Sequence, residues 1–285
     1  MMKNGPHIDE RAAGLELRGL GAGYARQSVL EGLDLPRIAP GALVALVGPN
    51  AVGKSTLLKA IAGLQPVRGQ VLLDGIDLAT LGQRERLLRV GYLPQALPQA
   101  TSLVAYEAML SALRASRPDW SRAHAEDAIA RVFATLGLDA LALRALNQLS
   151  GGQRQMIGLA QMLVREPRLL LLDEPTSALD LRWQLQVLQT VRARIDQGGT
   201  LAVIAVHDLN LALRFCDHIV VLGRSQGASR LLAAGRPAQV LTPALLAQAY
   251  GVRARVEHCS RGHPLVLADE ALEPPSRQTG ERGTP

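Results

Sequence analysis

The sequence lacks any long apolar run. A membrane-spanning helix needs about 20 consecutive apolar residues, whereas the strongest runs here are four to six residues long, at Ala42–Val47, Leu169–Leu172 and Leu201–Val206. We expect these runs to be buried strands. The first residues, MMKNGPHIDERAAG, are polar and contain no apolar signal-peptide core, so we expect the chain to stay where it is made.

Cysteine is scarce as well. The chain has only Cys216 and Cys259, which are too few for a disulfide framework, and a helix and a C-terminal loop are expected around them. With 285 residues the chain can bury a large core without covalent cross-links. A reducing cytoplasm fits this composition.

A concentrated basic segment is also missing. The chain has 31 Lys and Arg against 25 Asp and Glu, a formal charge of +6 that can attract nucleic acid or an anionic membrane. The arginines are scattered along the chain, and no basic block alternates with aromatic residues. Solvated faces therefore explain the charge better than a nucleic-acid site does.

Short apolar runs alternate with helical patterns along most of the chain, which predicts an α/β fold with a mainly parallel sheet. Between Gln95 and Arg165 the strand-like runs disappear and helix formers dominate, so we expect an inserted α-helical subdomain at about residues 96–165. Its expected helices are Ala105–Arg114, Ser121–Leu136 and Gly152–Val164. Ser121 is the expected N-cap of the second helix, and Gly137 is its expected stop.

The segment Gly48-Pro-Asn-Ala-Val-Gly-Lys-Ser-Thr56 matches G-x-x-x-x-G-K-[ST] between an apolar strand and a helical pattern. Such a loop wraps a phosphate with inward N–H groups at a helix N-terminus, and the pattern arises by chance in roughly one chain in a hundred. We expect Lys54 to reach the β and γ phosphates, Ser55 to bind Mg²⁺ and Thr56 to contact the α phosphate. The predicted nucleotide ligands are Gly48, Pro49, Asn50, Ala51, Val52, Gly53, Lys54, Ser55 and Thr56.

The apolar run Leu169–Leu172 ends in two carboxylates, Asp173 and Glu174. Phosphoryl transfer to water needs such groups. Asp173 is predicted to hold Mg²⁺ through water, and Glu174 to polarise the attacking water as the general base. Alone, this pair would equally suit a solvated strand end; the phosphate loop in the same chain favours the catalytic interpretation.

A second glycine-rich motif is Leu149-Ser-Gly-Gly-Gln153. A helix cap near Gly152 would account for its structure but not for its presence beside a phosphate loop. A serine N-cap followed by two glycines predicts a second anion-binding helix start. The candidate phosphate ligands in it are Ser150, Gly151, Gly152 and Gln153.

With these motifs in this order, the sequence resembles the nucleotide-binding subunits of ABC transporters from about Leu15 to Gly251. The resemblance implies a P-loop NTPase ABC cassette: a mainly parallel sheet core, an N-terminal antiparallel β part and the helical insertion. It implies ATP hydrolysis with Mg²⁺ in a head-to-tail dimer, where each nucleotide lies between one chain's phosphate loop and the other chain's LSGGQ signature. We expect a disordered N-terminus at 1–14, the ATPase domain at 15–255, and an extension at 256–285, disordered from about 273.

The same resemblance assigns four further residues. Tyr24 matches the aromatic residue that stacks on adenine, and Gln95 the glutamine that contacts Mg²⁺ and the lytic water. Asp180 ends a loop, Ser177-Ala-Leu-Asp, that crosses the dimer interface, and His207 matches the histidine that binds the γ phosphate. Taken singly, Tyr24 would be an ordinary strand aromatic and His207 a structural histidine.

Within the family, Tyr92-Leu-Pro-Gln-Ala-Leu-Pro and Val206-His-Asp-Leu-Asn-Leu-Ala are similar to importer ATPases for iron-siderophore, haem and cobalamin complexes. That similarity implies a second copy of the chain and integral-membrane permease subunits as partners, with a substrate-binding protein acting indirectly. It also implies a peripheral position on the cytoplasmic face of the inner membrane. Trp183 and the stretch Gln99-Ala-Thr-Ser102 depart from the subgroup, which leaves the substrate open.

Three alternatives remain at this stage: the ATPase of another import system, a soluble cassette acting on nucleic acid, and a nucleotide sensor without turnover. Relatives in translation carry two cassettes in one chain, and chromosome or break-repair relatives split the cassette around a coiled coil. This sequence has neither feature. Glu174 and His207 together argue against the sensor, and we expect no nucleic-acid partner.

Overall fold

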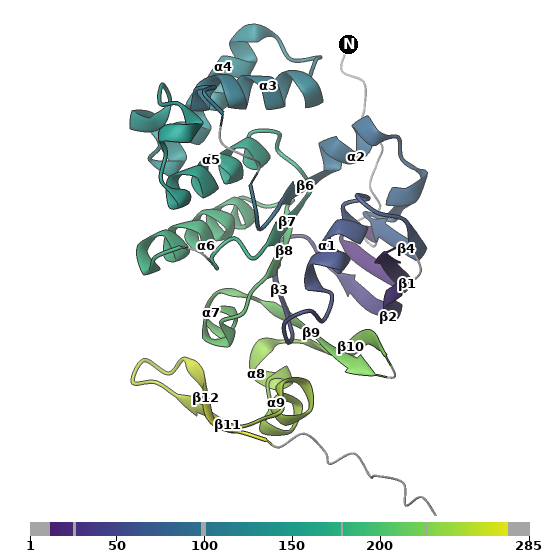
Figure 1. Ribbon diagram of the computed structural model, residues 1–285. Coiled ribbons are helices and arrows are strands. Elements are labelled where there is room, and N and C mark those ends of the chain that lie inside the picture. The colour runs from purple at the N-terminus through teal and green to yellow at the C-terminus, as the bar shows by residue number, and fades with distance from the viewer. Residues whose placement is uncertain (1–11, 25–26, 98–100, 178, 226, 273–285) are drawn as a thin grey trace, which may run out of the picture.

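The computed structural model describes residues 12–24, 27–97, 101–177, 179–225 and 227–272 (Figure 1). The ends that we expect to be disordered lie mostly outside these ranges. Within the described residues, no helix combines the length and the apolar character needed to cross a membrane.

A ten-stranded sheet forms the centre of the molecule, in the order β5-β4-β1-β2-β10-β9-β3-β8-β7-β6. Neighbouring strands from β9 to β6 in this order run parallel. The strands of this part are β3 (Leu43–Val47), β6 (Val90–Leu93), β7 (Leu169–Asp173), β8 (Leu201–Ala205) and β9 (His218–Ser225). The predicted α/β fold with a mainly parallel core is confirmed.

The other half of the sheet is mostly antiparallel, as expected for an ABC cassette. Its strands are β1 (Leu15–Tyr24), β2 (Gln27–Ile38), β4 (Val67–Leu73), β5 (Ile76–Asp77) and β10 (Ala228–Gly235). Strand β10 pairs antiparallel with β9 and joins β2 through the single parallel pair Ser229–Leu30, so a late strand links the two halves.

Each parallel strand is buried on both faces because its side chains alternate between two cores. In β3, Leu43, Ala45 and Val47 belong to one core, and Val44 and Leu46 belong to the other. This explains why the parallel strands appear in the sequence as continuous apolar runs rather than alternating patterns.

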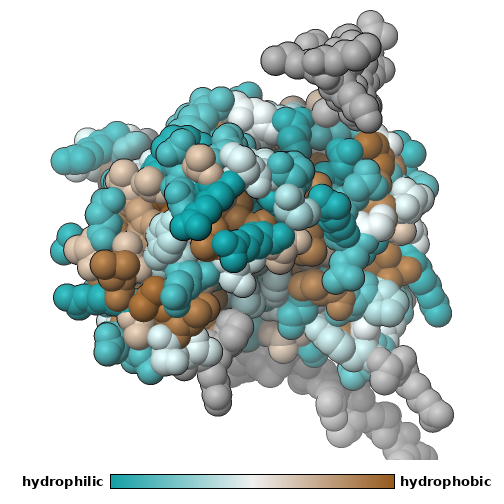
Figure 2. Space-filling view, turned by 90° about the horizontal axis from the view of Figure 1, so that it is seen from above, coloured by the Kyte–Doolittle hydropathy of each residue, from teal (hydrophilic) through white to brown (hydrophobic). Residues whose placement is uncertain are grey.

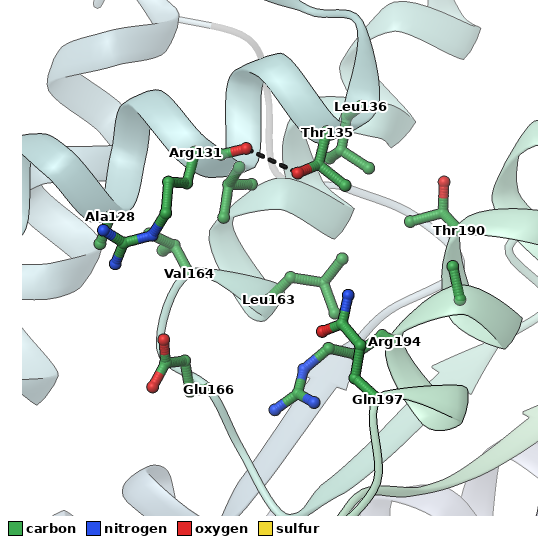
Figure 3. A pocket seen from close by; sticks show the side chains of 12 residues that line it. Ala128, Arg131, Thr135, Leu136, Leu163, Val164, Glu166, Thr190, Arg194 and Gln197 are labelled. Carbon is green, nitrogen blue, oxygen red and sulfur yellow. Dashed lines mark hydrogen bonds between the residues drawn. The ribbon is translucent and has the colours of Figure 1, made fainter.

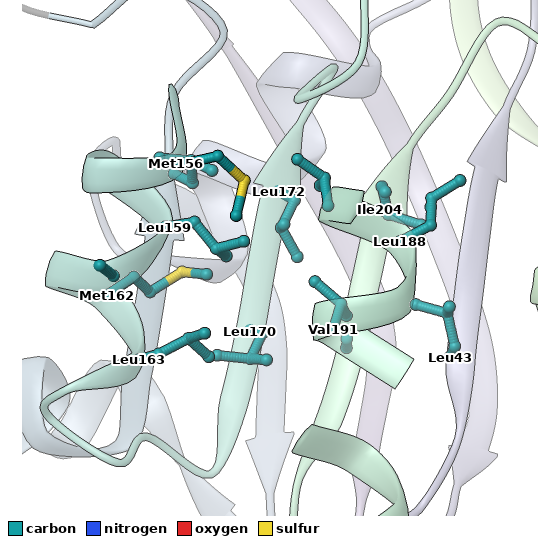
Figure 4. Packing of buried hydrophobic residues seen from close by; sticks show 14 of the residues in the cluster. Leu43, Met156, Leu159, Met162, Leu163, Leu170, Leu172, Leu188, Val191 and Ile204 are labelled. Atoms are coloured by element: carbon teal, nitrogen blue, oxygen red, sulfur yellow. The ribbon is translucent and has the colours of Figure 1, made fainter. Parts of the chain in front are cut away.

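Helices cover the two faces of the sheet separately. Helix α1 (Lys54–Ile61) packs on one face, and α5 (Gly151–Leu163), α6 (Leu181–Asp196) and α7 (Leu209–Phe215) pack on the other. Figure 4 shows Leu159 of α5 and Val191 of α6 on either side of Leu170 and Leu172 of β7. The phosphate loop precedes α1 and the signature begins α5, so the two motifs of one chain adjoin helices that cover opposite faces of the sheet.

The helical insertion contains α3 (Ala105–Ser116), α4 (Arg122–Leu136) and α5, each within two residues of its predicted bounds. Ser121 caps α4, with its Oγ accepting a hydrogen bond from His124 N at 3.2 Å. Gly137 ends α4 with a left-handed φ of +64°. Helix α2 (Gln83–Arg89) precedes β6, outside the insertion.

A groove of about 450 Å³ lies where α4, the end of α5 and α6 meet (Figure 3). Arg131 comes from α4, Glu166 follows α5, and Arg194 comes from α6. Its described lining residues include none of the predicted nucleotide ligands.

The C-terminal part continues through α8 (Pro237–Val240) and α9 (Pro243–Tyr250) into a hairpin of β11 (Val252–His258) and β12 (Pro264–Ala271). Asn210 of α7 binds Val266 of β12 on both sides: its Oδ1 accepts from Val266 N at 2.8 Å, and its Nδ2 donates to Val266 O at 3.3 Å. The sequence predicted only a C-terminal loop around Cys259, and the structure has a hairpin there. Cys259 lies in the turn of this hairpin.

Candidate active site

The predicted phosphate loop joins β3 to α1 through backbone that favours glycine. Gly48, Ala51 and Gly53 have φ values of +149°, +59° and +96°. A Cβ at Gly48 would lie 2.5 Å from Leu222 O, and one at Gly53 would lie 2.9 Å from side chains of Val29 and Leu30. Both positions therefore require glycine.

Lys54 lies inside this loop, with its side chain folded back over it. Its Nζ donates to Gly48 O at 3.0 Å and to Pro49 O at 3.2 Å, and the residue is only 5% exposed. Burial lowers the pKa of Lys54, and the charges of Glu174 and Asp173 oppose that shift. The loop thus holds a buried ammonium at its centre, the arrangement a nucleotide phosphate requires.

Asp173 ends β7 and is 2% exposed. Its Oδ1 accepts a hydrogen bond from Ser55 Oγ at 2.8 Å, so two of the three predicted Mg²⁺ ligands are in direct contact, while the third, Gln95, donates to Glu174. A hydroxyl and a carboxylate are the oxygen ligands that Mg²⁺ prefers, so these residues fit the ion. Its Oδ2 accepts from the Tyr92 hydroxyl at 3.1 Å.

Glu174 follows Asp173 in a left-handed backbone conformation, with φ of +49°, that turns its side chain into the site. Its Oε2 accepts from Gln95 Nε2 at 2.8 Å, and its Oε1 lies 2.5 Å from His207 Nε2. These side chains follow the ends of β6, β7 and β8, which are neighbours in the sheet. The fold therefore brings all three predicted catalytic residues together.

These groups share one open cleft of about 490 Å³. Tyr24, 52% exposed at the end of β1, lines it as the expected adenine contact would. Val52 was predicted as a ligand, but the residue is only 1% exposed and is not among the described residues that line the cleft. The lining residues are Tyr24, Val29, Asn50, Ala51, Gly53, Lys54, Ser55, Thr56, Gln95, Glu174 and His207.

Comparison with known proteins decides the family. A family model described as ABC transporter matches residues 31–177 of the sequence. The chain belongs to the ABC transporter family. It is an ATPase subunit of that family.

Relatives match the ABC subunit over nearly its whole length. The hemin import ATP-binding protein HmuV of Jannaschia sp. strain CCS1 is 40% identical over 84% of this chain and 88% of that protein. The achromobactin transport ATP-binding protein CbrD of Dickeya dadantii is 35% identical over 92% and 97%. A solved structure of an ATP-binding subunit of an ABC transporter is 26% identical, with a TM-score of 0.70, and covers 84% of this chain and 95% of that one.

The ABC signature forms the first turn of α5. Ser150 Oγ accepts from Gln153 N at 3.3 Å, and Gln153 Oε1 accepts from Ser150 N at 3.0 Å, a reciprocal capping box. Helix α5 begins at Gly151 rather than at the predicted Gly152, because Ser150 is the cap. Gly151 and Gly152 follow it without side chains that would cover the backbone N–H groups.

The loop before α6 connects Asp173 and Glu174 to α6. Ser177 Oγ donates to Glu174 O at 3.1 Å, and Asp180 caps α6 by accepting from Trp183 N at 3.0 Å. Ala178 of this predicted interface loop lies outside the described residues.

Tyr92 is the site residue that sequence reasoning missed. It lies in β6, paired in register with Leu171 of β7, and this register brings its hydroxyl to Asp173. The available signal was a polar hydroxyl in an otherwise apolar strand, three residues before Gln95.

Proposed function

We propose that this chain is the ATP-hydrolysing subunit of a membrane importer for haem, iron-siderophore or cobalamin complexes. The observation that carries the hydrolytic part is the Glu174 carboxylate, oriented by Gln95 and His207 above the phosphate loop. The import part rests on relatives named for hemin import and for achromobactin transport.

In this proposal, Glu174 takes a proton from the water that attacks the γ phosphorus, while the bond to the β-phosphate oxygen breaks. Gln95 and His207 keep the carboxylate in position, and His207 then donates to the γ phosphate. Lys54 neutralises charge on the β and γ phosphates. Ser55 and Asp173 would hold Mg²⁺, which when bound would withdraw charge from the phosphate oxygens.

The general base is tested by Glu174→Gln, which keeps the shape of the side chain and removes its basicity. We expect ATP binding and ATP-dependent dimerisation to persist, while turnover falls by about two orders of magnitude or more. Phosphate release and size-exclusion chromatography measure these. Hydrolysis at the native rate would remove Glu174 from the role of base.

The proposed working unit is a head-to-tail dimer, because the signature of one chain begins a helix on the other side of the sheet from α1 and is not among the described residues that line the cleft around its own phosphate loop. Ser150→Ala and Gly152→Asp should therefore lower turnover while leaving nucleotide binding to the isolated subunit intact. Loss of binding in the isolated subunit would contradict the shared site.

We further propose that the helical insertion binds permease subunits at the cytoplasmic face of the inner membrane. Leu103 and Leu143 are 39% and 83% exposed, and the bridge Val104–Ala145 brings their segments together. Figure 2, seen from above, shows brown hydrophobic patches among the hydrophilic residues of this end of the molecule. Exposed apolar groups of this kind favour a protein partner.

Cargo is tested by reconstituting the chain in vesicles with the permease and binding protein encoded beside its gene. Haem, a ferric siderophore and cobalamin are each added on the binding-protein side, and ATP hydrolysis is followed. Stimulation by one of them identifies the cargo. Stimulation by none, with the basal ATPase intact, would contradict this substrate class.

A further inference from the structure

Trp183, in the first turn of α6, lies against the signature helix. A Cβ at Gly152 would be 2.9 Å from Cδ1 of the indole and 3.1 Å from both Cγ and Nε1. Contacts this short leave no room for a side chain at position 152, so the indole packs directly against Gly152 on the side where a Cβ would lie. Part of the remaining surface packs against the large core shared by α5 and α6, and the residue stays partly exposed.

The backbone at Trp183 is tied to the loop that carries Asp180. Trp183 N donates to Asp180 Oδ1 at 3.0 Å. The next residue, Gln184, donates from Nε2 to Thr176 O at 3.2 Å and to Leu179 O at 3.0 Å. The start of α6 is thus bound to Thr176, Leu179 and Asp180, and the indole projects from this end of the helix onto the signature.

A second contact ties α6 to the helical insertion farther along. Gln186 Nε2 donates to Leu136 O, at the end of α4, at 3.0 Å. This bond lies beyond the first turn of α6, away from the signature. At the N-terminal end of α6, Trp183 supplies the contact with Gly152 in the first turn of α5.

We propose that Trp183 is a positioning residue that couples the signature to the Asp180 loop, so that these two parts move together against the partner's nucleotide. This inference rests on the proposed shared-site ATPase. An indole suits the role because it is large and rigid, and it fills the space over a glycine without needing a hydrogen bond there. A smaller polar side chain at this position would leave the contact with Gly152 unfilled.

The proposal predicts a specific kinetic change. Removing the indole leaves a gap beside Gly152 and allows the signature to shift relative to the Asp180 loop. Since small misplacements of binding groups cost catalysis steeply, we expect Trp183→Ala to lower kcat about tenfold. Nucleotide affinity of the isolated subunit should not change, because Trp183 is not among the described residues that line the cleft around Lys54.

The kinetic test compares Trp183→Ala with Trp183→Phe in the full chain, measuring kcat, KM for ATP and the thermal midpoint. The phenyl ring keeps most of the packing, so Trp183→Phe should recover most of the native kcat. Trp120→Phe is the matched control, since Trp120 lies between α3 and α4 against His124. A native kcat in Trp183→Ala, or no recovery in a folded Trp183→Phe, would overturn the proposal.

A spectroscopic test separates this inference from the proposed function. The chain has two tryptophans, so Trp120→Phe leaves Trp183 as the only indole. In the Trp120→Phe, Glu174→Gln double variant, ATP but not ADP should shift the Trp183 emission to shorter wavelength and reduce its quenching by acrylamide. Unchanged emission in a sample that size exclusion shows to be dimeric would overturn the coupling. Absence of the dimer itself would overturn the shared-site function instead.

Discussion

The Tyr92 hydroxyl donates a 3.1 Å hydrogen bond to Oδ2 of Asp173, while Ser55 binds the other carboxylate oxygen at 2.8 Å. Burial, and then the charge of Asp173, raise the pKa of Tyr92, so the phenol stays protonated and remains a donor. Both oxygens of a carboxylate that is 2% exposed are therefore engaged. The hydrogen bonds from Ser55 and Tyr92 therefore fix the orientation of the Asp173 carboxylate.

Tyr92→Phe should lower the apparent affinity of the enzyme for Mg²⁺. A hydrogen bond to a charged group contributes about 1.5–3 kcal/mol, so we expect the Mg²⁺ concentration for half-maximal ATPase activity to rise by about tenfold or more. A titration of activity with Mg²⁺ at fixed ATP measures this. Tyr106→Phe, a change in α3 of the helical insertion, serves as the control. Identical titrations for Tyr92→Phe and the native chain would contradict the assignment.

Gly53→Ala should unfold the phosphate loop locally. The residue has φ of +96°, and the added methyl would lie 2.9 Å from side-chain atoms of Leu30 and Val29. Backbone strain of this kind costs about 1–3 kcal/mol, so we expect a lower thermal midpoint together with loss of ATP binding. The matched control is Gly82→Ala, where φ is −61° and no atom lies within 4 Å of the new Cβ. A Gly53→Ala chain that binds ATP normally would refute the prediction.

Asp74→Asn should lower the free energy of unfolding without changing the rate of ATP hydrolysis. Asp74 is buried, accepts from Gly14 N at 2.9 Å, and pairs with Arg168 at 3.0 Å. Its φ of +52° suits asparagine, so the loss is that of the charge. Breaking a fully buried pair costs about 3–5 kcal/mol; we expect about 2–3 kcal/mol here, because Arg168 is 33% exposed and partly solvated.

Urea unfolding measures that change in the free energy of unfolding. The control is Glu16→Gln, which removes a surface pair with Arg18 and should leave the unfolding midpoint unchanged. Equal midpoints for Asp74→Asn and Glu16→Gln would show that the buried pair contributes nothing.

The two cysteines should react at very different rates in the native protein. Burial raises the pKa of Cys216 to about 12, whereas backbone N–H groups of Arg261 and His263 lower the pKa of Cys259. Only the thiolate reacts, and at pH 8 a thiol with a pKa near 12 is ionised to roughly one part in ten thousand. A thiol reagent should therefore label Cys259 quickly and Cys216 slowly.

The same reagent should label two cysteines after unfolding in urea. Cys259→Ser should abolish the fast phase and leave the slow one. Raising the pH from 6 to 8 should speed the fast phase, because deprotonation of Cys259 increases through that range. Two equally fast thiols in the native chain would contradict the raised pKa of Cys216.

Much of the nucleotide site followed from local sequence. The phosphate loop needs glycines and a lysine at set spacing, because Gly48 and Gly53 adopt backbone conformations that exclude larger residues. The parallel strands were predictable since burial on both faces requires continuous apolar runs. The capping of α4 by Ser121 and of α5 by Ser150 is equally local.

Tertiary structure alone decided the contacts between distant segments. Tyr92 reaches Asp173 through the register of β6 with β7, Trp183 reaches Gly152 through the packing of α6 beside α5, and the C-terminal hairpin is held by Asn210. A one-residue change of register would turn each strand side chain to the other face. The sequence by itself determined which groups can bind and cleave a nucleotide; the fold decided what orients them, because orientation depends on neighbours that are far away in the chain.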